Sequence, residues 1–302
     1  MIDFTKIAVS ATFGILAIMG SGCRLMYREA QATRLLEKSR LMSQQAVFAM
    51  EKGDLQEADH LLVQALQLCP QDVEARARYS RLLWQCGRRD EALDQMKIAL
   101  RMAPQDTGLH LQIAQQYLDL GRLTEAQFHI QKVLELAPEN PGGWILQGRL
   151  ALARNNPEEA LSSFHRAAGL RPNDREILEW IAQAYEARGD ADQVLAVRQR
   201  IIDTFAPGEE SVEALTALAE AHRAVGRYAS AAEIYLQVAG KAQNPEPYLL
   251  AAGENYLRAG DSQRALIVTN QILAQNPHNP RARDLYNRAQ EVTVASQSPI
   301  LR

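Results

Sequence analysis

The stretch that decides the fold is PGGWILQGRLALARNNPEEALSSFHRAAGLRPND, residues 141–174. It places small residues at Gly148 and Ala160 and closes with Pro172. Small residues at these two places let two antiparallel helices approach closely, and a proline at the end stops the second helix. The stretch therefore predicts one helical hairpin of 34 residues.

The same pattern recurs along the chain with a fixed period. Its anchor positions are 53, 87, 121, 155, 189, 226 and 260, which step by 34 residues except for one step of 37. Prolines follow the same phase at 70, 104, 138, 172 and 277. Two residue series in one phase indicate stacked repeats, because one hairpin cannot bury its apolar face alone. The residues that define the pattern are Gly53, Ala58, Gly87, Ala92, Gly121, Ala126, Trp144, Gly148, Ala160, Gly189, Gly226, Ala231, Gly260 and Ala265.

This pattern resembles that of tetratricopeptide repeat (TPR) proteins, whose period is 34 residues. The resemblance covers residues 39–279. It implies an all-α fold, a right-handed superhelical solenoid of about seven helical hairpins whose first helices line a concave groove. The expected repeats are 39–72, 73–106, 107–140, 141–174, 175–208, 212–245 and 246–279, with residues 209–211 as an insertion.

The segments next to the repeats are also predicted to be mostly helical. Residues 24–38 contain no glycine or proline and should form a helical lead-in. Residues 280–292 begin with a proline, which favours a helix start, and should form a capping helix. Such a cap shields the last repeat with a polar outer face. Residues 293–302 are expected to be a disordered tail.

The N-terminal segment indicates attachment to a membrane. Residues 7–23 carry no charged side chain and end in Gly-Ser-Gly-Cys. This ending resembles the lipobox of bacterial lipoproteins, which implies that residues 1–23 are a signal segment, that Cys23 is lipidated and that the protein faces the periplasm. The alternative is a single-pass transmembrane anchor. More basic residues follow the apolar run than precede it, which would leave the repeats in the cytoplasm.

Composition and motifs exclude several classes of function. The chain has 33 Lys and Arg against 36 Asp and Glu, a net charge of −3, whereas nucleic-acid-binding surfaces are strongly basic. It contains no His-Glu-x-x-His zinc pattern, no phosphate-binding Gly-x-x-x-x-Gly-Lys-Ser/Thr and no Gly-x-Ser-x-Gly nucleophile turn. We therefore predict no enzymatic activity, no cofactor, no metal, no nucleic acid and no small-molecule substrate.

The resemblance also implies a partner-binding surface. In TPR proteins the groove is formed by the second, fifth, sixth, ninth, twelfth and thirteenth residues of each repeat. Through the fourth repeat these places hold four arginines and three acids, a net charge of +1. In the last three repeats they hold two arginines and six glutamates, a net charge of −4. The residues expected to contact a partner are Arg78, Arg81, Trp84, Leu111, Gln115, Leu118, Ile145, Arg149, Trp180, Gln183, Glu186, Glu220 and Glu254.

Two interpretations of these apolar groove residues remain open. A large apolar surface with a polar rim is typical of a protein interaction site. Alternatively, the leucines pack against neighbouring helices and the charges only keep the surface soluble. The first interpretation predicts a membrane-tethered scaffold that binds a protein or peptide during assembly of an envelope complex. The alternatives are an accessory or regulatory subunit of an enzyme complex and an RNA-binding helical repeat.

Overall fold

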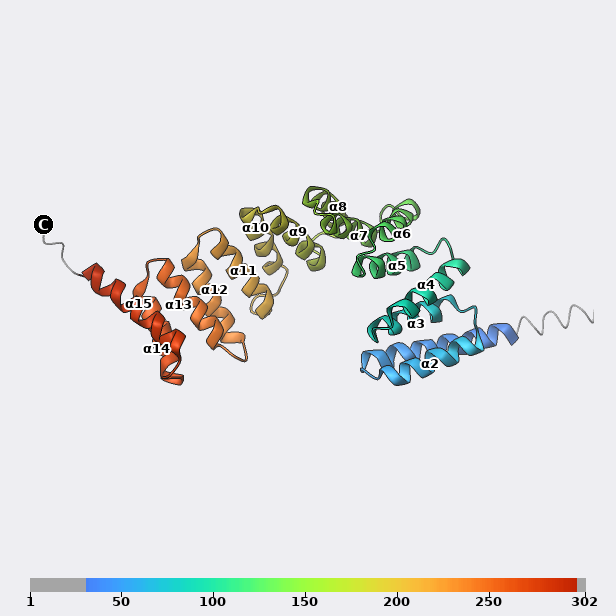
Figure 1. Cartoon of the computed structure of the whole chain (residues 1–302), viewed down its shortest axis with the longest axis horizontal. Helices are drawn as coiled ribbons and strands as arrows, with labels where there is room; N and C mark the ends of the chain where they lie inside the picture. The colour runs from blue at the N-terminus through green and yellow to red at the C-terminus, as the bar shows by residue number, and fades with distance from the viewer. Residues whose placement is uncertain (1–30, 298–302) are drawn as a thin grey trace, which may run out of the picture. The chain divides into compact units, whose positions relative to one another are not determined.

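The computed structural model describes residues 31–297, and within them the chain is helical throughout, with no strand (Figure 1). The predicted all-α class is confirmed. Residues 1–30 lie outside the described part, so the predicted signal segment, Cys23 and most of the lead-in are not covered. The rest of the lead-in, residues 31–38, belongs to a leading helix that runs over residues 31–51.

The helices that follow form a regular series of hairpins. In chain order they are α2 (Leu55–Leu68), α3 (Val73–Gln85), α4 (Arg89–Met102), α5 (Thr107–Asp119), α6 (Leu123–Leu136), α7 (Pro141–Ala153), α8 (Pro157–Leu170), α9 (Arg175–Arg188), α10 (Ala191–Ile202), α11 (Val212–Ala224), α12 (Tyr228–Lys241), α13 (Glu246–Arg258), α14 (Ser262–Gln275) and α15 (Pro280–Gln297). From α3 onward the first helix of each hairpin begins 34 residues after the previous one, except for the step of 37 between α9 and α11.

Local sequence explains why the hairpins turn where they do. The anchor glycines of the repeat lie between the two helices of a hairpin and adopt positive φ, for example +81° at Gly53. This left-handed conformation ends a helix at little cost for glycine. Asn155, which replaces the glycine in the best-matched repeat, adopts the same conformation with φ of 57°. Asparagine tolerates it better than most residues, so the turn is kept there.

Side chains before the helices supply the matching start signals. The Asp72 carboxylate accepts a hydrogen bond from the backbone N–H of Ala75, 3.0 Å away, and so caps the N-terminus of α3. Asn140, Asp174 and Ser211 cap α7, α9 and α11 in the same way. Each cap satisfies a backbone N–H group that has no partner inside the helix. Capping therefore fixes where these hairpins begin, whereas α13 begins after Pro245 without a side-chain cap.

The helices divide into two compact units, with residues up to Asp119 in the first and those from Leu120 in the second. The boundary falls inside the third predicted repeat, between α5 and α6. In the first unit, the leading helix packs on α2 and α3 through Ala46, Leu62 and Leu82, which are fully buried. The hydroxyl of Ser39 adds a buried hydrogen bond of 2.7 Å to the carboxylate of Asp72.

The second unit is built around a very close helix–helix approach. Phe164 on α8 is fully buried, and its ring lies against Gly148 on α7. A β-carbon at Gly148 would come within 2.4 Å of the Phe164 ring, so no other residue fits there without rearrangement. Ala160 on α8 is also fully buried. The same core cluster continues into α9 and α10, which joins two successive hairpins.

The C-terminal helix α15 closes the second unit and is longer than predicted. Leu285 is buried and packs against Gly253 on α13, where a β-carbon would come within 2.8 Å of its side chain. The helix continues to Gln297, so residues 293–297 are helical rather than part of a disordered tail. One cause is Thr293, whose hydroxyl bonds to the carbonyl of Ala289 and the hydroxyl of Ser262, each at 2.8 Å. Residues 298–302 are not described.

We predict that Gly148→Ala destabilises the second unit by about 1–3 kcal/mol, because the added methyl group overpacks the Phe164 ring. Gly169→Ala is the matched control. Gly169 lies in the same pair of helices, at α8, and a β-carbon there meets no atom within 4 Å. That substitution should be neutral or slightly stabilising, because alanine favours helices. Hydrogen exchange of α7–α9 amides measures both, and equal protection in the two variants would contradict the packing described.

Candidate functional site

One cavity of the second unit lies between α9, α10 and α11. Its volume is about 300 Å³. Its lining combines predicted groove places on the first helices with residues from the α9–α10 turn and from α10. The lining residues are Glu186, Gly189, Asp190, Ala191, Val194, Arg198, Ala217, Glu220, Ala221 and Ala224.

The cavity has an apolar wall and an acidic rim. Val194 and Ala221 are 7% and 4% exposed, and together with Ala217 they supply methyl groups from two helices. Glu186 and Glu220 are exposed carboxylates that line the same space from α9 and α11. Glu220 forms no ion pair with any residue among those the structure describes. The cavity is therefore amphipathic, with unneutralised negative charge at its edge.

Arg198, on α10, contributes the positive charge of the lining, but two carboxylates already neutralise it. Its guanidinium donates hydrogen bonds to Glu179 and, at 3.0 Å, to Glu186. The side chain is only 11% exposed. Burial disfavours the charged form, yet these two hydrogen bonds outweigh it and raise the pKa of Arg198. Arg198 therefore ties α10 to α9 rather than offering a free charge.

Asp190 is paired as well, so it keeps its charge in the turn between α9 and α10. Its carboxylate accepts a hydrogen bond of 2.7 Å from Arg188 and one of 3.3 Å from the backbone N–H of Gln193. Both bonds favour the charged form and lower the pKa of Asp190. Arg188 also lies 3.4 Å from Glu158 on α8. The turn that borders the cavity is thus held by a small network of charges.

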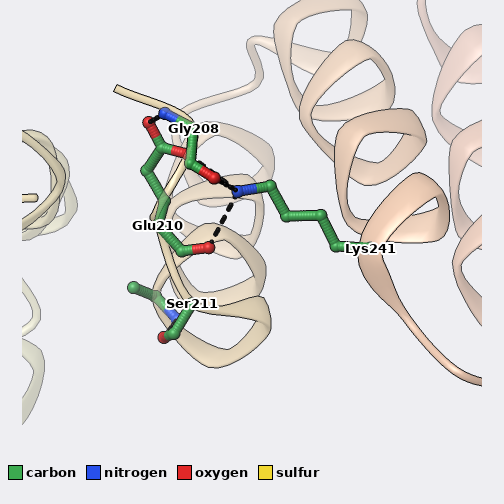
Figure 2. Close-up of polar contacts among 5 residues, drawn as sticks. Gly208, Glu210, Ser211 and Lys241 are labelled. Carbon is green, nitrogen blue, oxygen red and sulfur yellow. Dashed lines mark hydrogen bonds and ion pairs between the residues drawn. The ribbon is translucent and has the colours of Figure 1, made fainter. Parts of the chain in front are cut away.

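The connection between α10 and α11 does not line the cavity and is fixed by Lys241 (Figure 2). The ammonium of Lys241 donates to the backbone carbonyls of Gly208 and Glu210, at 2.8 and 3.0 Å, and to the Glu210 carboxylate at 2.9 Å. That carboxylate also accepts a bond of 2.9 Å from the backbone N–H of Gly208. The bond from Lys241, followed by that from Gly208, lowers the pKa of Glu210 to about 2. The insertion is therefore an ordered loop.

The first unit has a smaller cavity, of about 180 Å³, that is also lined by predicted groove places. Arg78 donates a hydrogen bond of 2.6 Å to the Ser43 hydroxyl and forms an ion pair with Glu74. Arg81 is exposed. The cavity lies between the leading helix and α3, and its lining residues are Val47, Met50, Glu51, Arg78, Arg81 and Gln85.

Four of the predicted groove residues line a cavity: Arg78, Arg81, Glu186 and Glu220. The remaining polar ones lie elsewhere. Gln183 is exposed, and Glu254 forms an ion pair of 3.4 Å with Arg281. Gln115, half-buried on α5, donates a bond of 2.5 Å to Asp119. Within each unit, the predicted groove residues that line a cavity are thus charged ones rather than apolar ones.

The predicted apolar and aromatic groove residues are less available. Ile145 is wrong as a surface residue: it is 8% exposed and belongs to the core cluster around Phe164. Trp180 is half-buried, with its ring stacked on Phe164 at 6.1 Å and the Arg149 guanidinium 4.7 Å from its centroid. These side chains therefore pack against other residues of the same unit, which leaves less of their surface available to a partner. Leu111 and Leu118 on α5 are half-buried too, as is Trp84. The Arg89 guanidinium lies over the Trp84 ring, 4.1 Å from its centroid.

Sequence reasoning missed the second-helix side of the cavity. The groove places of the family lie on first helices, whereas Val194 and Arg198 lie on α10 and Asp190 in the turn before it. Arg198 is 12 and 19 residues from its two glutamates, too far for a local spacing rule. One usable signal was the five glutamates at groove places on α9 and α11, which leave an excess of negative charge.

The described part of the chain offers no other kind of site. Between residues 31 and 297, no group of three or more His, Cys, Asp or Glu side chains is arranged to hold a metal ion. None of the described helices combines the length and apolar character needed to cross a membrane. The cavities and their charged rims are therefore the features from which a function can be argued.

Comparison with known families and structures agrees with this architecture. The family model for the TPR domain of cytochrome c-type biogenesis protein H matches residues 123–247, and a general tetratricopeptide repeat model matches residues 49–98. No curated protein sequence matches the chain. The chain is thus a tetratricopeptide repeat protein, and the predicted family is confirmed.

Similar solved structures support the same fold. A tetratricopeptide repeat protein from Parabacteroides merdae has a TM-score of 0.56 at 17% identity, over 84% of this chain and 99% of that one. PilW, a type IV pilus biogenesis factor, has a TM-score of 0.56 at 14% identity, over 82% and 97%. PilF from Pseudomonas aeruginosa has a TM-score of 0.54 at 13% identity, over 84% and 97%. The chain therefore has the helical-repeat fold of these structures.

We predict that the Glu210 carboxylate titrates near pH 2, well below the ordinary value of 4.5. Because folding lowers this pKa, the loop contacts stabilise the protein fully above about pH 4.5 and are lost as the pH falls toward 2. Lys241→Met should raise the Glu210 midpoint and increase hydrogen exchange in residues 206–211. Carboxylate carbon NMR measures the midpoint.

Lys132→Met is the control for this experiment. It removes an ion pair of 2.6 Å with Glu135 on α6, which does not involve the loop. The Glu210 midpoint should be the same in this variant as in the unmodified protein. A Glu210 midpoint near 4.5 in the unmodified protein would show that the Lys241 contacts do not persist in solution.

Proposed function

We propose that this protein is a non-catalytic adaptor, tethered to a membrane by its N-terminus, that binds a protein or peptide segment on its groove surface. The observation that carries the proposal is that groove places of the repeat line the cavity between the leading helix and α3 and supply part of the lining of the cavity between α9, α10 and α11. Cavities with apolar walls and a few charged side chains are typical binding sites. No group of three or more His, Cys, Asp or Glu side chains that could hold a metal ion lies among the described residues.

The adaptor's biological setting is proposed to be the assembly of an envelope complex. One of the similar structures, PilW, is by name a type IV pilus biogenesis factor. PilW and PilF of Pseudomonas aeruginosa each share the fold over more than four-fifths of this chain. A second candidate is an accessory subunit in cytochrome c biogenesis. It is favoured by the family model that matches residues 123–247, a range that includes the cavity between α9, α10 and α11.

Membrane attachment is proposed from the sequence of the N-terminal segment. Residues 7–23 are uncharged and end in small residues before Cys23. The proposal is that Cys23 carries the lipid and that the repeats face the periplasm. An uncleaved anchor with cytoplasmic repeats is the alternative. A tether of either kind would hold the groove near a membrane-bound partner and raise its effective concentration.

Site-specific photo-crosslinking tests whether the groove surface is where the partner binds. A photoreactive amino acid at Gln85 or Gln183 should capture one and the same partner from native membranes, because both are exposed at predicted groove places. The matched controls are Gln131 and Gln271, which are exposed on the second helices α6 and α14. They should capture nothing, or different proteins.

Crosslinks that arise from Gln131 and Gln271 but not from the groove positions would overturn the proposal, because the partner would then bind the second-helix surface. Capture of RNA at any of the four positions would favour the RNA-binding alternative. Mass spectrometry of the crosslinked species distinguishes these results.

Mass spectrometry of the mature N-terminus tests the membrane attachment. We expect a chain that begins at Cys23 and carries a diacylglycerol modification, and we expect Cys23→Ala to abolish both cleavage and lipidation. Cys69→Ala, which alters a half-buried cysteine between α2 and α3, is the control and should leave processing unchanged. An intact N-terminal methionine in the unmodified protein, with Cys23→Ala still membrane-bound, would establish the transmembrane anchor instead.

A further inference from the structure

We infer that the cavity between α9, α10 and α11 is a pocket for a single lysine or arginine side chain of the bound partner. The inference rests on the proposed function, since it names the chemistry recognised by one part of the groove surface. It is drawn from the size of the cavity, its apolar wall and the balance of charge around it.

The size of the cavity suits one long side chain. Its volume of about 300 Å³ is at the lower limit for ligand-binding cavities. It is bounded by the α9–α10 turn on one side and by α11 on the other. A folded partner cannot enter such a space, whereas a side chain that projects from an extended or helical segment can.

The wall of the cavity matches an aliphatic stem. Val194, Ala217 and Ala221 present methyl groups, and no polar atom of these side chains requires a partner. Lysine and arginine bury their methylene groups along apolar surface while the charged end remains among polar groups. A short acidic or amide side chain would leave these methyl groups uncovered. The wall therefore favours a long side chain with a terminal polar group.

The charge of the rim selects a cation. Three carboxylates line the cavity, from Glu186, Asp190 and Glu220, against one guanidinium, from Arg198. The two bonding partners just outside the lining, Glu179 and Arg188, cancel each other in this balance. Two negative charges therefore remain uncompensated. A bound ammonium or guanidinium would relieve the repulsion between them.

Arg198 does not make the cavity an anion site. Its side chain is 11% exposed, and its guanidinium already bonds to both Glu179 and Glu186. An incoming carboxylate would have to displace one of these glutamates while facing Glu220. Glu220 is the lining carboxylate with no ion-pair partner among residues 31–297, so it is the group expected to bond the incoming cation.

The probe for this inference is Nα-acetyl-arginine amide, compared with Nα-acetyl-citrulline amide, which has nearly the same shape without the charge. Methyl NMR of the full-length chain in detergent follows Val194, Ala217 and Ala221. The arginine amide should shift these three signals in a saturable manner, and the citrulline amide should bind at least about fivefold more weakly.

Variants link the binding to the rim. Glu220→Gln should weaken the arginine amide about fivefold, and Ala217→Leu should abolish binding because its side chain fills the cavity. Asp192→Asn is the matched control: it removes an exposed carboxylate in the first turn of α10 that does not line the cavity, and should leave the affinity unchanged. Hydrogen exchange of α9–α11 verifies that each variant is folded.

Three results would overturn the inference. Equal binding of the citrulline and arginine amides would mean that charge is not recognised, and tighter binding of Nα-acetyl-glutamate amide would make the cavity an anion site. Absence of any methyl shift would mean that no side chain of this kind enters. Failure of this inference is distinguishable from failure of the proposed function. Crosslinks from Gln183 without binding of the arginine amide would support the adaptor function and contradict the pocket. Binding of the arginine amide without crosslinks from the groove positions would support the pocket and contradict the adaptor function.

Discussion

The close approach of two helices within each hairpin is the constraint on which the rest of the structure depends. At Gly148 the absence of a side chain lets the Phe164 ring lie directly against the backbone of α7. That contact buries Phe164 completely and lets the same cluster extend into α9 and α10. Since each hairpin is stabilised mainly by its neighbours, the spacing within one hairpin sets the surface that the next one packs on.

Most of the fold could be predicted from the sequence, because its determinants are local and periodic. The anchor glycines and the capping residues act within a few positions of their own helix, and the repeat period places them. Asn155 shows that even an altered repeat keeps the turn when the new residue tolerates positive φ. The end of α15 was mispredicted for the opposite reason. Thr293 extends the helix through a bond to Ser262, 31 residues away, which no local pattern contains.

The candidate site was only partly predictable. The family pattern of groove places identified Glu186 and Glu220, but not the α10 residues opposite them. It also counted Ile145 and Trp180 as accessible, although packing against Phe164 buries one and half-buries the other. The family pattern predicts which face of a helix a residue lies on, but not how much of its side chain the neighbouring helices bury. Charged residues were predicted better because burial of an unpaired charge is unfavourable, which keeps them at the surface.

The last helix also has a consequence for self-association. Leu285 occupies the apolar position against Gly253 that a further hairpin would otherwise need, and the outward side of α15 carries Arg281, Asp284 and Arg288, whose side chains are 56–70% exposed. A second copy that stacked on this side of α15 would have to dehydrate these three charges, while the exposed apolar side chains of the helix, Val292 and Val294, lie nearer its C-terminal end. End-to-end stacking of copies through residues 281–288 of α15, which would extend the repeats into a filament, is therefore disfavoured.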